Sequence, residues 1–483
     1  MKEIILLFFL FSKFTFASFD MNENMQSSYT HILALEFDEA GLKIAKEQAA
    51  NPDNGFIHLH KNYIDFLTII IGEDLGFFKS AEKQKAERII MLKENDKGSP
   101  YYLYSQAEIH LQWAFSRLKF EDYISAAYEF VRAYHLLEKN AELYPNFTLN
   151  KKGLGLLHSL LGVVPDKYHW ILNLAGLQGN VDLGFAELDM VLKDSEYQMY
   201  KNEVLFLVSF LQINLKNNNT VCQEYLDIIG DGYTTNYLLN FAAARLSHNL
   251  GQNDYCLKVL ENRPSSFGKH PFYFLDYLQG MSYLYKLDYE KSMQSFTFYI
   301  DQFKGVNYIK SSYHKLAWIA ELQNDTTKKK YYFDKVISEG HEYIDIDKVA
   351  LKEARKEYIS HPILLKARLL YDGGYYLEAL DKLQEQTFFD NAEYFYRMAR
   401  IKYELDFKHL EVISDYQKVV DLGKKSTNYY GPMSVLQIGL IYEQNNDFKN
   451  AESSFNKCLS ISNFDYERGV HQKAKSGLDR IKN

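Results

Sequence analysis

Histidine residues are the first place to look for metal or acid–base chemistry in this chain, which contains 14 of them. The closest pair is His58 and His60. Residues two apart on a helix lie about 200° around its axis, so these two side chains would not face one metal ion. The chain has no His-Glu-x-x-His zinc motif, and His158 beside Ser159 lacks the Gly-x-Ser-x-Gly turn of a nucleophilic serine. We therefore expect no metal, no cofactor and no catalytic group.

A glycine-rich stretch from Gly176 to Gly184 invites comparison with a phosphate-binding loop. In nucleotide-binding proteins such a loop follows a β-strand and leads into a Lys-Ser/Thr pair. Neither feature is present here. We interpret the glycines as helix breakers and as points where helices pack closely. Neighbouring carboxylates such as Asp345 and Asp347 are interpreted as solvated surface.

Three cysteines, Cys222, Cys256 and Cys458, are odd in number and widely spaced. This spacing fits neither a disulfide framework nor a zinc knuckle. A disulfide between Cys222 and Cys256 stays open, but we favour burial of each cysteine as a small apolar side chain.

The composition favours a helical globular protein. The 483 residues are 47% hydrophobic and 24% charged, and only 8 are proline, so long uninterrupted helices are permitted. The net charge of −8 and the absence of a basic stripe argue against nucleic acid as a partner.

The N-terminus has the pattern of an export signal. Lys2 precedes an apolar run from Ile4 to Phe11, and Thr15-Phe16-Ala17 forms a small-x-small cleavage site. The apolar run is shorter than the ~20 residues that a membrane span needs, although an uncleaved anchor stays open as the alternative. We therefore expect cleavage after Ala17 and a periplasmic or secreted protein with no integral membrane span.

The elements that would position any site are helical hairpins repeated along the chain. Around Gly439, small and aromatic residues alternate: Tyr442, Ala451 and Phe455 follow the glycine at offsets +3, +12 and +16. These offsets resemble the tetratricopeptide motif, a pair of antiparallel helices. Only small side chains fit where two helices cross closely, and aromatic rings fill the space beside the crossing.

The same spacing recurs around other anchor residues. Around Gly280 it places Tyr283, Ser292 and Phe296 at the same three offsets. Arg400 is a poor residue for a tight crossing. The longest interval between anchors leaves room for an additional helix over residues 347–358. The anchors are Ala244, Gly280, Ala317, Ala367, Arg400 and Gly439.

These repeats predict an all-α fold in which tetratricopeptide-like hairpins stack into a right-handed superhelix, an α-solenoid. In the N-terminal half the repeats are harder to register, and Ala114, Ala126 and Ala133 mark one candidate hairpin. The expected division is a signal peptide at 1–17, an irregular helical half at 18–229, tetratricopeptide repeats at 230–463 and a capping helix at 464–483.

Residues 153–188 do not follow a plain repeat. Leu160-Leu161 leads to Pro165, and an apolar helix, a glycine-rich turn and a further leucine-containing helix follow. This order resembles the tetratricopeptide repeat protein 39 family and its fungal inclusion-body-clearance relatives. The resemblance implies a helical-repeat adaptor without assigned catalytic residues. An export signal departs from that family, whose members act inside eukaryotic cells.

The tetratricopeptide resemblance also implies where a ligand would bind. In such a superhelix the first helix of each hairpin lines the concave groove, at positions six and three before the anchor and one and four after it. The residues that this rule selects as candidate groove contacts are Phe241, Arg245, His248, Tyr277, His314, Trp318, His361, Arg368, Tyr371, Tyr394 and Arg397.

Two functions are compatible with this groove. The first is an exported, non-enzymatic scaffold that binds a protein or peptide partner through aromatic and charged side chains. The alternative is a protein that captures a solute or glycan and works with an envelope transporter.

Overall fold

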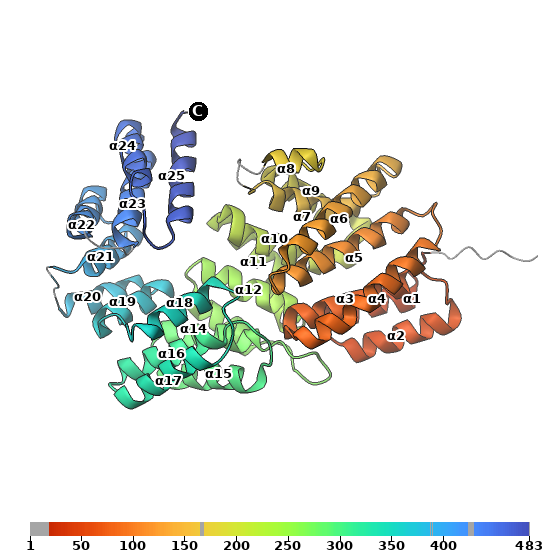
Figure 1. Cartoon of the computed structure of the whole chain (residues 1–483), viewed down its shortest axis with the longest axis horizontal. Coiled ribbons are helices and arrows are strands. Elements are labelled where there is room, and N and C mark those ends of the chain that lie inside the picture. The colour runs from red at the N-terminus through yellow and green to blue at the C-terminus, as the bar shows by residue number, and fades with distance from the viewer. Residues whose placement is uncertain (1–18, 165–168, 387, 389, 424–428, 483) are drawn as a thin grey trace, which may run out of the picture.

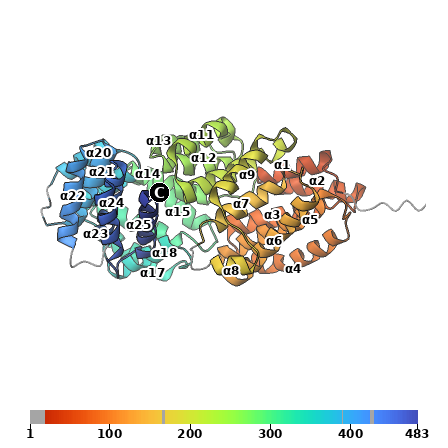
Figure 2. The same cartoon turned by 90° about the horizontal axis from the view of Figure 1, so that it is seen from above.

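The computed structural model describes residues 19–164, 169–386, 388, 390–423 and 429–482, and every regular element in these ranges is helical. The predicted all-α solenoid is confirmed. The helices form a curved row of hairpins that runs from α1 at one end of an elongated molecule towards α22 at the other (Figures 1 and 2). The predicted signal peptide lies outside the described residues.

In the N-terminal half α1 packs against α2 and α7 packs against α9, and α5 packs against α6 as the spacing of Ala114, Ala126 and Ala133 predicted. The helices are α1 (Glu23–Leu33), α2 (Phe37–Ala50), α3 (Phe56–Gly72), α4 (Leu75–Lys93), α5 (Pro100–Lys119), α6 (Tyr123–Leu143), α7 (Asn150–Leu161), α8 (His169–Leu174), α9 (Val181–Lys193), α10 (Lys201–Leu211) and α11 (Asn219–Ile229).

The C-terminal half continues the row in the same way, and α24 is followed by α25, which packs on the last hairpin. The helices are α12 (Tyr237–Asn249), α13 (Asn253–Glu261), α14 (Phe274–Tyr285), α15 (Tyr289–Gln302), α16 (Ile309–Leu322), α17 (Thr326–Ser338), α18 (Asp345–Arg355), α19 (Pro362–Asp372), α20 (Tyr376–Gln384), α21 (Ala392–Glu404), α22 (His409–Leu422), α23 (Tyr430–Gln444), α24 (Phe448–Leu459) and α25 (Glu467–Lys482).

One turn geometry joins the two helices of several hairpins. A residue in the left-handed backbone region is followed at once by an aspartate whose carboxylate accepts a hydrogen bond from the third N–H group of the second helix. This turn fixes the angle at which the chain reverses. It occurs at Glu121-Asp122, Leu287-Asp288, Asn324-Asp325 and Asn446-Asp447.

The predicted close crossing is present in the last hairpin. A Cβ atom on Gly439 would lie 2.7 Å from the ring of Phe455, which is fully buried, so any larger residue would displace that ring. The glycines of the 153–188 segment have the same role. A Cβ on Gly184 of α9 would collide with Ser159 and with the backbone of Gly155 in α7. This packing confirms the structural interpretation of these glycines.

The core of the N-terminal half is one continuous cluster of buried side chains that extends from Met25 to Leu275. It therefore continues past residue 230, where the sequence analysis placed the boundary between the halves. All three cysteines are buried and free, which confirms the expected packing role. None of the helices in the described ranges is long and apolar enough to cross a membrane.

Candidate functional site

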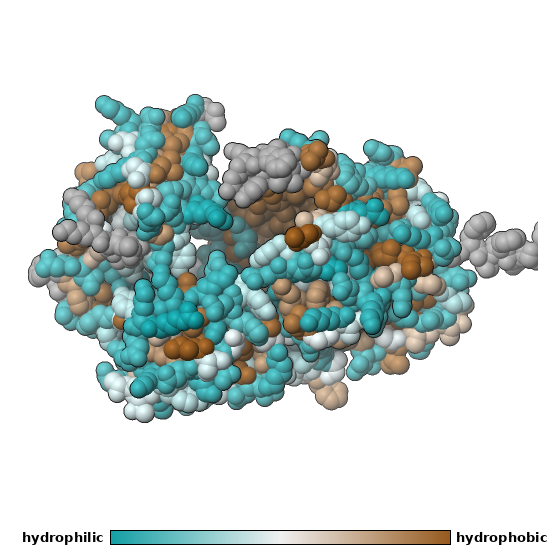
Figure 3. All heavy atoms as spheres, in the orientation of Figure 1, coloured by the Kyte–Doolittle hydropathy of each residue, from teal (hydrophilic) through white to brown (hydrophobic). Residues whose placement is uncertain are grey.

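A chain of connected hollows lines the concave side of the C-terminal repeats, and we call it the central groove. Its surface comes from the first helix of successive hairpins, because these helices face inward while the second helices cover the outside. Adjoining hollows share Tyr285 and Asp372, so they form one surface. Figure 3 shows the hollowed face of the molecule. The central groove is defined by Arg245 and His248 of α12, Tyr285 of α14, Lys315 and Trp318 of α16, and Arg368 and Asp372 of α19.

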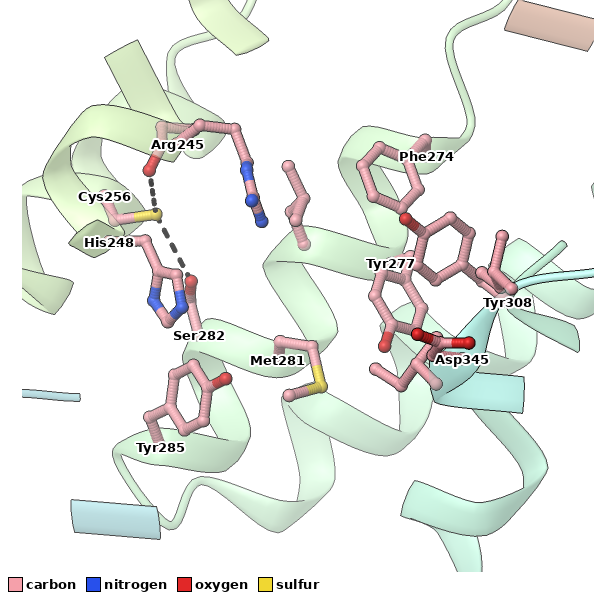
Figure 4. A pocket seen from close by; sticks show the side chains of 14 residues that line it. Arg245, His248, Cys256, Phe274, Tyr277, Met281, Ser282, Tyr285, Tyr308 and Asp345 are labelled. Atoms are coloured by element: carbon pink, nitrogen blue, oxygen red, sulfur yellow. Dashed lines mark hydrogen bonds between the residues drawn. The ribbon is translucent and has the colours of Figure 1, made fainter. Parts of the chain in front are cut away.

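Seven of the eleven residues selected from the sequence line these hollows. One of these hollows has a volume of about 390 Å³ and lies between α12 and α14 (Figure 4). The repeat rule therefore selects residues that line the central groove, and ligand contact at these residues stays a prediction. The seven are Arg245, His248, Tyr277, His314, Trp318, Arg368 and Tyr371.

The other four selected residues are engaged elsewhere. Phe241 packs between the rings of Phe206 and Phe272. The exposed His361 caps the start of α19 by accepting a hydrogen bond from the N–H of residue 363. In α21, Tyr394 is buried, and Arg397 forms a buried ion pair with residue 393, one helical turn away. Because of these local contacts, none of the four side chains lines the described hollows.

The aromatic side chains of the groove are held in place by one another. His248 stacks on Tyr285 with ring centroids 5.2 Å apart and an interplanar angle of 6°. Burial, with a further contribution from Arg245, lowers the pKa of His248 to about 4, so its ring is neutral at physiological pH. Tyr277 is 3% exposed and shares a 2.9 Å hydrogen bond with Ser311. These rings form a rigid wall rather than a set of free stacking faces.

Two cations of the groove have no hydrogen-bond or ion-pair partner among the described residues. The side chain of Arg245 extends into the hollow towards Met281 (Figure 4). Lys315 is 6% exposed, and its Nζ atom lies over the face of Trp318, 3.3 Å from the ring centroid, while Glu353 and Asp372 line the same hollow without a direct ion pair to it. A buried ammonium without a direct carboxylate partner is costly, because an aromatic face replaces only part of the lost hydration.

The remaining cations of the groove share one carboxylate. Arg368 Nε lies 3.6 Å from Asp372, and Arg400 Nη2 lies 4.0 Å from the same residue. Arg368 also lies over Trp318, 5.0 Å from the ring centroid, and Arg400 lies over Tyr371 at 4.0 Å. The groove therefore has a layer of guanidinium groups on aromatic rings, and the two guanidinium groups share Asp372.

Helix α18, which the long interval between anchors predicted, forms the opposite wall of the groove. Ile346, Val349 and Glu353 of this helix line the hollows. Asp347 holds α18 in place because its carboxylate accepts hydrogen bonds from the N–H groups of Tyr308 and Ser311, at 2.7 and 2.8 Å. Burial raises the pKa of Asp347 to about 6. The expectation that Asp347 is solvated surface was wrong, since it is fully buried.

Sequence reasoning missed several groove residues. Lys315 lies two residues before its anchor and Tyr285 five after, and neither offset belongs to the repeat rule. The groove wall formed by α18 was also missed, because a plain tetratricopeptide repeat has no helix at this position. Arg400 did leave a signal, because an arginine at a small-residue anchor requires a space that the tight crossing does not normally provide.

Metal chemistry finds no support in the described ranges, where no group of three or more His, Cys, Asp or Glu side chains is placed to hold an ion.

The environment of Lys315 predicts a pH-dependent stability difference. Burial, assisted by Arg368, lowers the pKa of Lys315 from 10.5 to about 7 in the folded protein. Between these two values the unfolded chain binds a proton that the folded chain does not, so this group makes the free energy of unfolding rise with pH. Lys315→Met removes this contribution. The variant should be more stable than the parent at pH 7, and the difference should shrink towards pH 10, with a steepest slope of about 1.4 kcal/mol per pH unit.

Urea titrations across this pH range measure the difference. Lys328→Met, on the exposed face of α17, is the matched control and should show a constant difference from the parent. A constant difference for Lys315→Met as well would show that the Lys315 ammonium is well solvated or paired.

The comparison with protein families agrees with the helical-hairpin architecture. The tetratricopeptide repeat model matches residues 434–465, which contain most of α23 and all of α24. No curated protein matches the chain. Similar solved structures include yeast Tom70, with 12% identity, 95% of this chain and 88% of that chain covered, and a TM-score of 0.26. The tetratricopeptide domain of P58(IPK) is 14% identical, with 85% and 98% covered and a TM-score of 0.20.

A third similar structure is the Cut9–Hcn1 hetero-tetramer of the APC/C, at 12% identity, with 95% of this chain and 96% of that chain covered and a TM-score of 0.25. TM-scores of this size carry no inference about function. The assignment rests on the repeat match and on the hairpin stack itself. The chain is an all-helical α-solenoid that carries a tetratricopeptide repeat at residues 434–465.

Proposed function

We propose that this protein is an exported, non-enzymatic scaffold that binds an acidic segment of a protein partner in the central groove. A concave surface built from stacked hairpins suits an extended chain, because each repeat adds another set of contacts along its length. The observation that carries the proposal is Lys315, a nine-tenths buried ammonium that lines the groove without a hydrogen bond or ion pair to a carboxylate among the described residues, although Glu353 and Asp372 line the same hollow. A carboxylate from the partner would supply the missing counter-charge.

The chemistry of the neighbouring side chains supports the same ligand. Arg245 offers a second unpaired cation, and the planar guanidinium of Arg368 suits two parallel hydrogen bonds to a carboxylate. A bound carboxylate would favour protonation of Lys315, so binding would take up a proton near neutral pH. The affinity should therefore fall as pH rises above about 7.

Capture of a glycan or other solute, the second function expected from the sequence, has no supporting observation. Carbohydrates bind proteins by stacking on exposed aromatic faces. In the central groove the face of Trp318 is contacted by Lys315 and Arg368, and His248 covers Tyr285. The narrower resemblance to the tetratricopeptide repeat protein 39 family stays a prediction.

A peptide-display selection against the purified protein tests the proposal. We expect the enriched peptides to carry Asp or Glu at recurrent positions and their affinity to fall about tenfold or more in Lys315→Met, the loss of about 1.4 kcal/mol or more expected for a charged hydrogen bond. Titration calorimetry at several pH values measures both this loss and the decline in affinity above pH 7.

Two further variants accompany Lys315→Met: one removes a lysine charge outside the groove, and the other removes a second positive charge inside it. Lys328→Met, on the outside of the molecule, should bind like the parent. Arg368→Gln should weaken acidic peptides while preserving the fold, since its aromatic and aliphatic neighbours remain. Enrichment of peptides without carboxylates, or equal binding by Lys315→Met and the parent, would refute the proposed mode.

Export is the second part of the proposal, and it rests on the residue pattern up to Ala17. If the signal is cleaved, protein recovered from its native cells will have the mass of a chain that begins at Ser18. Intact-mass spectrometry of that material makes the measurement, with the cytoplasmic fraction as the comparison. A full-length mass together with recovery in the cytoplasm would contradict export.

A further inference from the structure

A second hollow lies on the concave side of the N-terminal half, and we call it the N-terminal pocket. Its volume is about 130 Å³, and most of its lining is apolar side chains contributed by inner helices of the hairpins. Figure 3 shows hydrophobic residues on a recessed surface beside the central opening, at the inner edge of this half of the molecule. The aromatic part of the lining comprises Tyr63, Phe66, Phe115, Phe206 and Phe272.

Charged groups lie among these apolar side chains. Lys152 of α7 is 2% exposed, and its Nζ atom donates to Oε2 of Glu108 and to Oε2 of Glu203, both at 2.8 Å. Tyr63 donates to Glu108 at 2.8 Å and receives a 2.9 Å hydrogen bond from Lys152. The hydroxyl of Tyr29 also donates to Glu203. Both carboxylates and the ammonium line the pocket.

The charges of this cluster do not balance. Two carboxylates surround one ammonium, and the tyrosines stay neutral because burial raises the pKa values of Tyr29 and Tyr63 far above their usual range. Glu108 is 4% exposed, and its Oε1 atom has no hydrogen-bond partner among the described residues. An uncompensated buried charge of this kind is strongly unfavourable unless a proton or a cation neutralises it.

We propose that the N-terminal pocket binds a primary ammonium group carried on a short apolar body. One additional positive charge would bring the cluster to two cations and two anions, and the apolar body would fill the remaining volume. Glu203, whose side chain is 15% exposed, is the more accessible carboxylate, and Glu108, at 5%, lines the same pocket. The aromatic faces of the pocket favour a cation in the same position.

The charge of the cluster also disfavours ligands whose polar group is a carboxylate or an alcohol. A carboxylate would bring a third negative charge into the cluster, whereas an alcohol would leave the existing imbalance unchanged. This preference is opposite to the one proposed for the central groove. The inference stands independently of the central groove, since the two hollows share no lining residue.

The test compares three probes with the same apolar body: n-hexylammonium, n-hexanol and n-hexanoate. Titration calorimetry of the full chain at neutral pH should show that hexylammonium binds about tenfold or more tightly than hexanol, as expected when a buried charge gains a partner. Hexanoate should not bind measurably. Equal affinities for hexylammonium and hexanol, a preference for hexanoate, or no binding of any probe would overturn the proposal.

Substitutions connect this preference to the cluster. Glu203→Gln should lower hexylammonium affinity to the level of hexanol while leaving hexanol unchanged, and Glu224→Gln on the exposed face of α11 should change neither. Leu207→Trp reduces the pocket volume without altering charge, so it should weaken both probes even if Glu203→Gln fails to fold. Unchanged hexylammonium binding in Leu207→Trp would place the amine outside the pocket.

The calorimetry also reports proton exchange. Burial raises the pKa of Glu108, whereas an incoming ammonium would favour its ionised form, so any proton released on binding would make the observed heat depend on the ionisation enthalpy of the buffer.

A fourth probe, the capped lysine Nα-acetyl-lysine N-methylamide, distinguishes the two possible sources of the ammonium group. Affinity close to that of hexylammonium indicates a lysine side chain of a bound segment, and much weaker affinity indicates a free alkylamine. Both results support the proposed chemistry.

Discussion

The whole structure depends on one constraint: a helical hairpin of this chain has too little apolar surface inside itself and must cover that surface with the next hairpin. Small anchors such as Gly439 and Gly280 let the two helices of a hairpin cross closely, and Phe455 and Phe296 fill the space beside each crossing. Stacking then follows, because the remaining apolar faces have only the neighbouring hairpins to contact. The concave surface is a consequence of this stacking, since the first helices of the hairpins are aligned along it.

Both hollows on that surface contain charged groups that are not fully paired among the described residues. In the central groove these are the cations Lys315 and Arg245, and in the N-terminal pocket the carboxylates Glu108 and Glu203 outnumber the one ammonium, Lys152. Buried ionic groups contribute little to stability compared with apolar residues of the same size. Their cost is easier to understand if a ligand supplies the missing charge. A segment that contacts both hollows would need an acidic part and an amine-bearing apolar part, which gives the scaffold a basis for selecting its partner.

The sequence predicts the architecture better than it predicts the surface. The offsets around Gly439 and Gly280 identify hairpins because two helices can cross closely only if small residues lie at the crossing, and this requirement involves residues close together in the sequence. The groove rule selects residues of the hollows where the first helix of a repeat borders them, as at Arg245 and Arg368. Arg397 and His361 lie outside the described hollows, because an acidic residue one turn earlier pairs with the guanidinium of Arg397 and His361 caps its own helix. Lys315 and the wall formed by α18 depend on contacts between distant parts of the chain, so no local pattern reveals them.

Photo-crosslinking tests the central claim most directly, because it locates the bound segment on the protein. A display-selected acidic peptide carrying a diazirine beside its carboxylate would be irradiated in complex with the full chain, and the modified residues would be identified by mass spectrometry. The account predicts modification in α14, α16, α18 and α19, at residues around Tyr285, Lys315 and Val349 that line the central groove. Modification confined to the outer helices α15, α17 and α20 would contradict it.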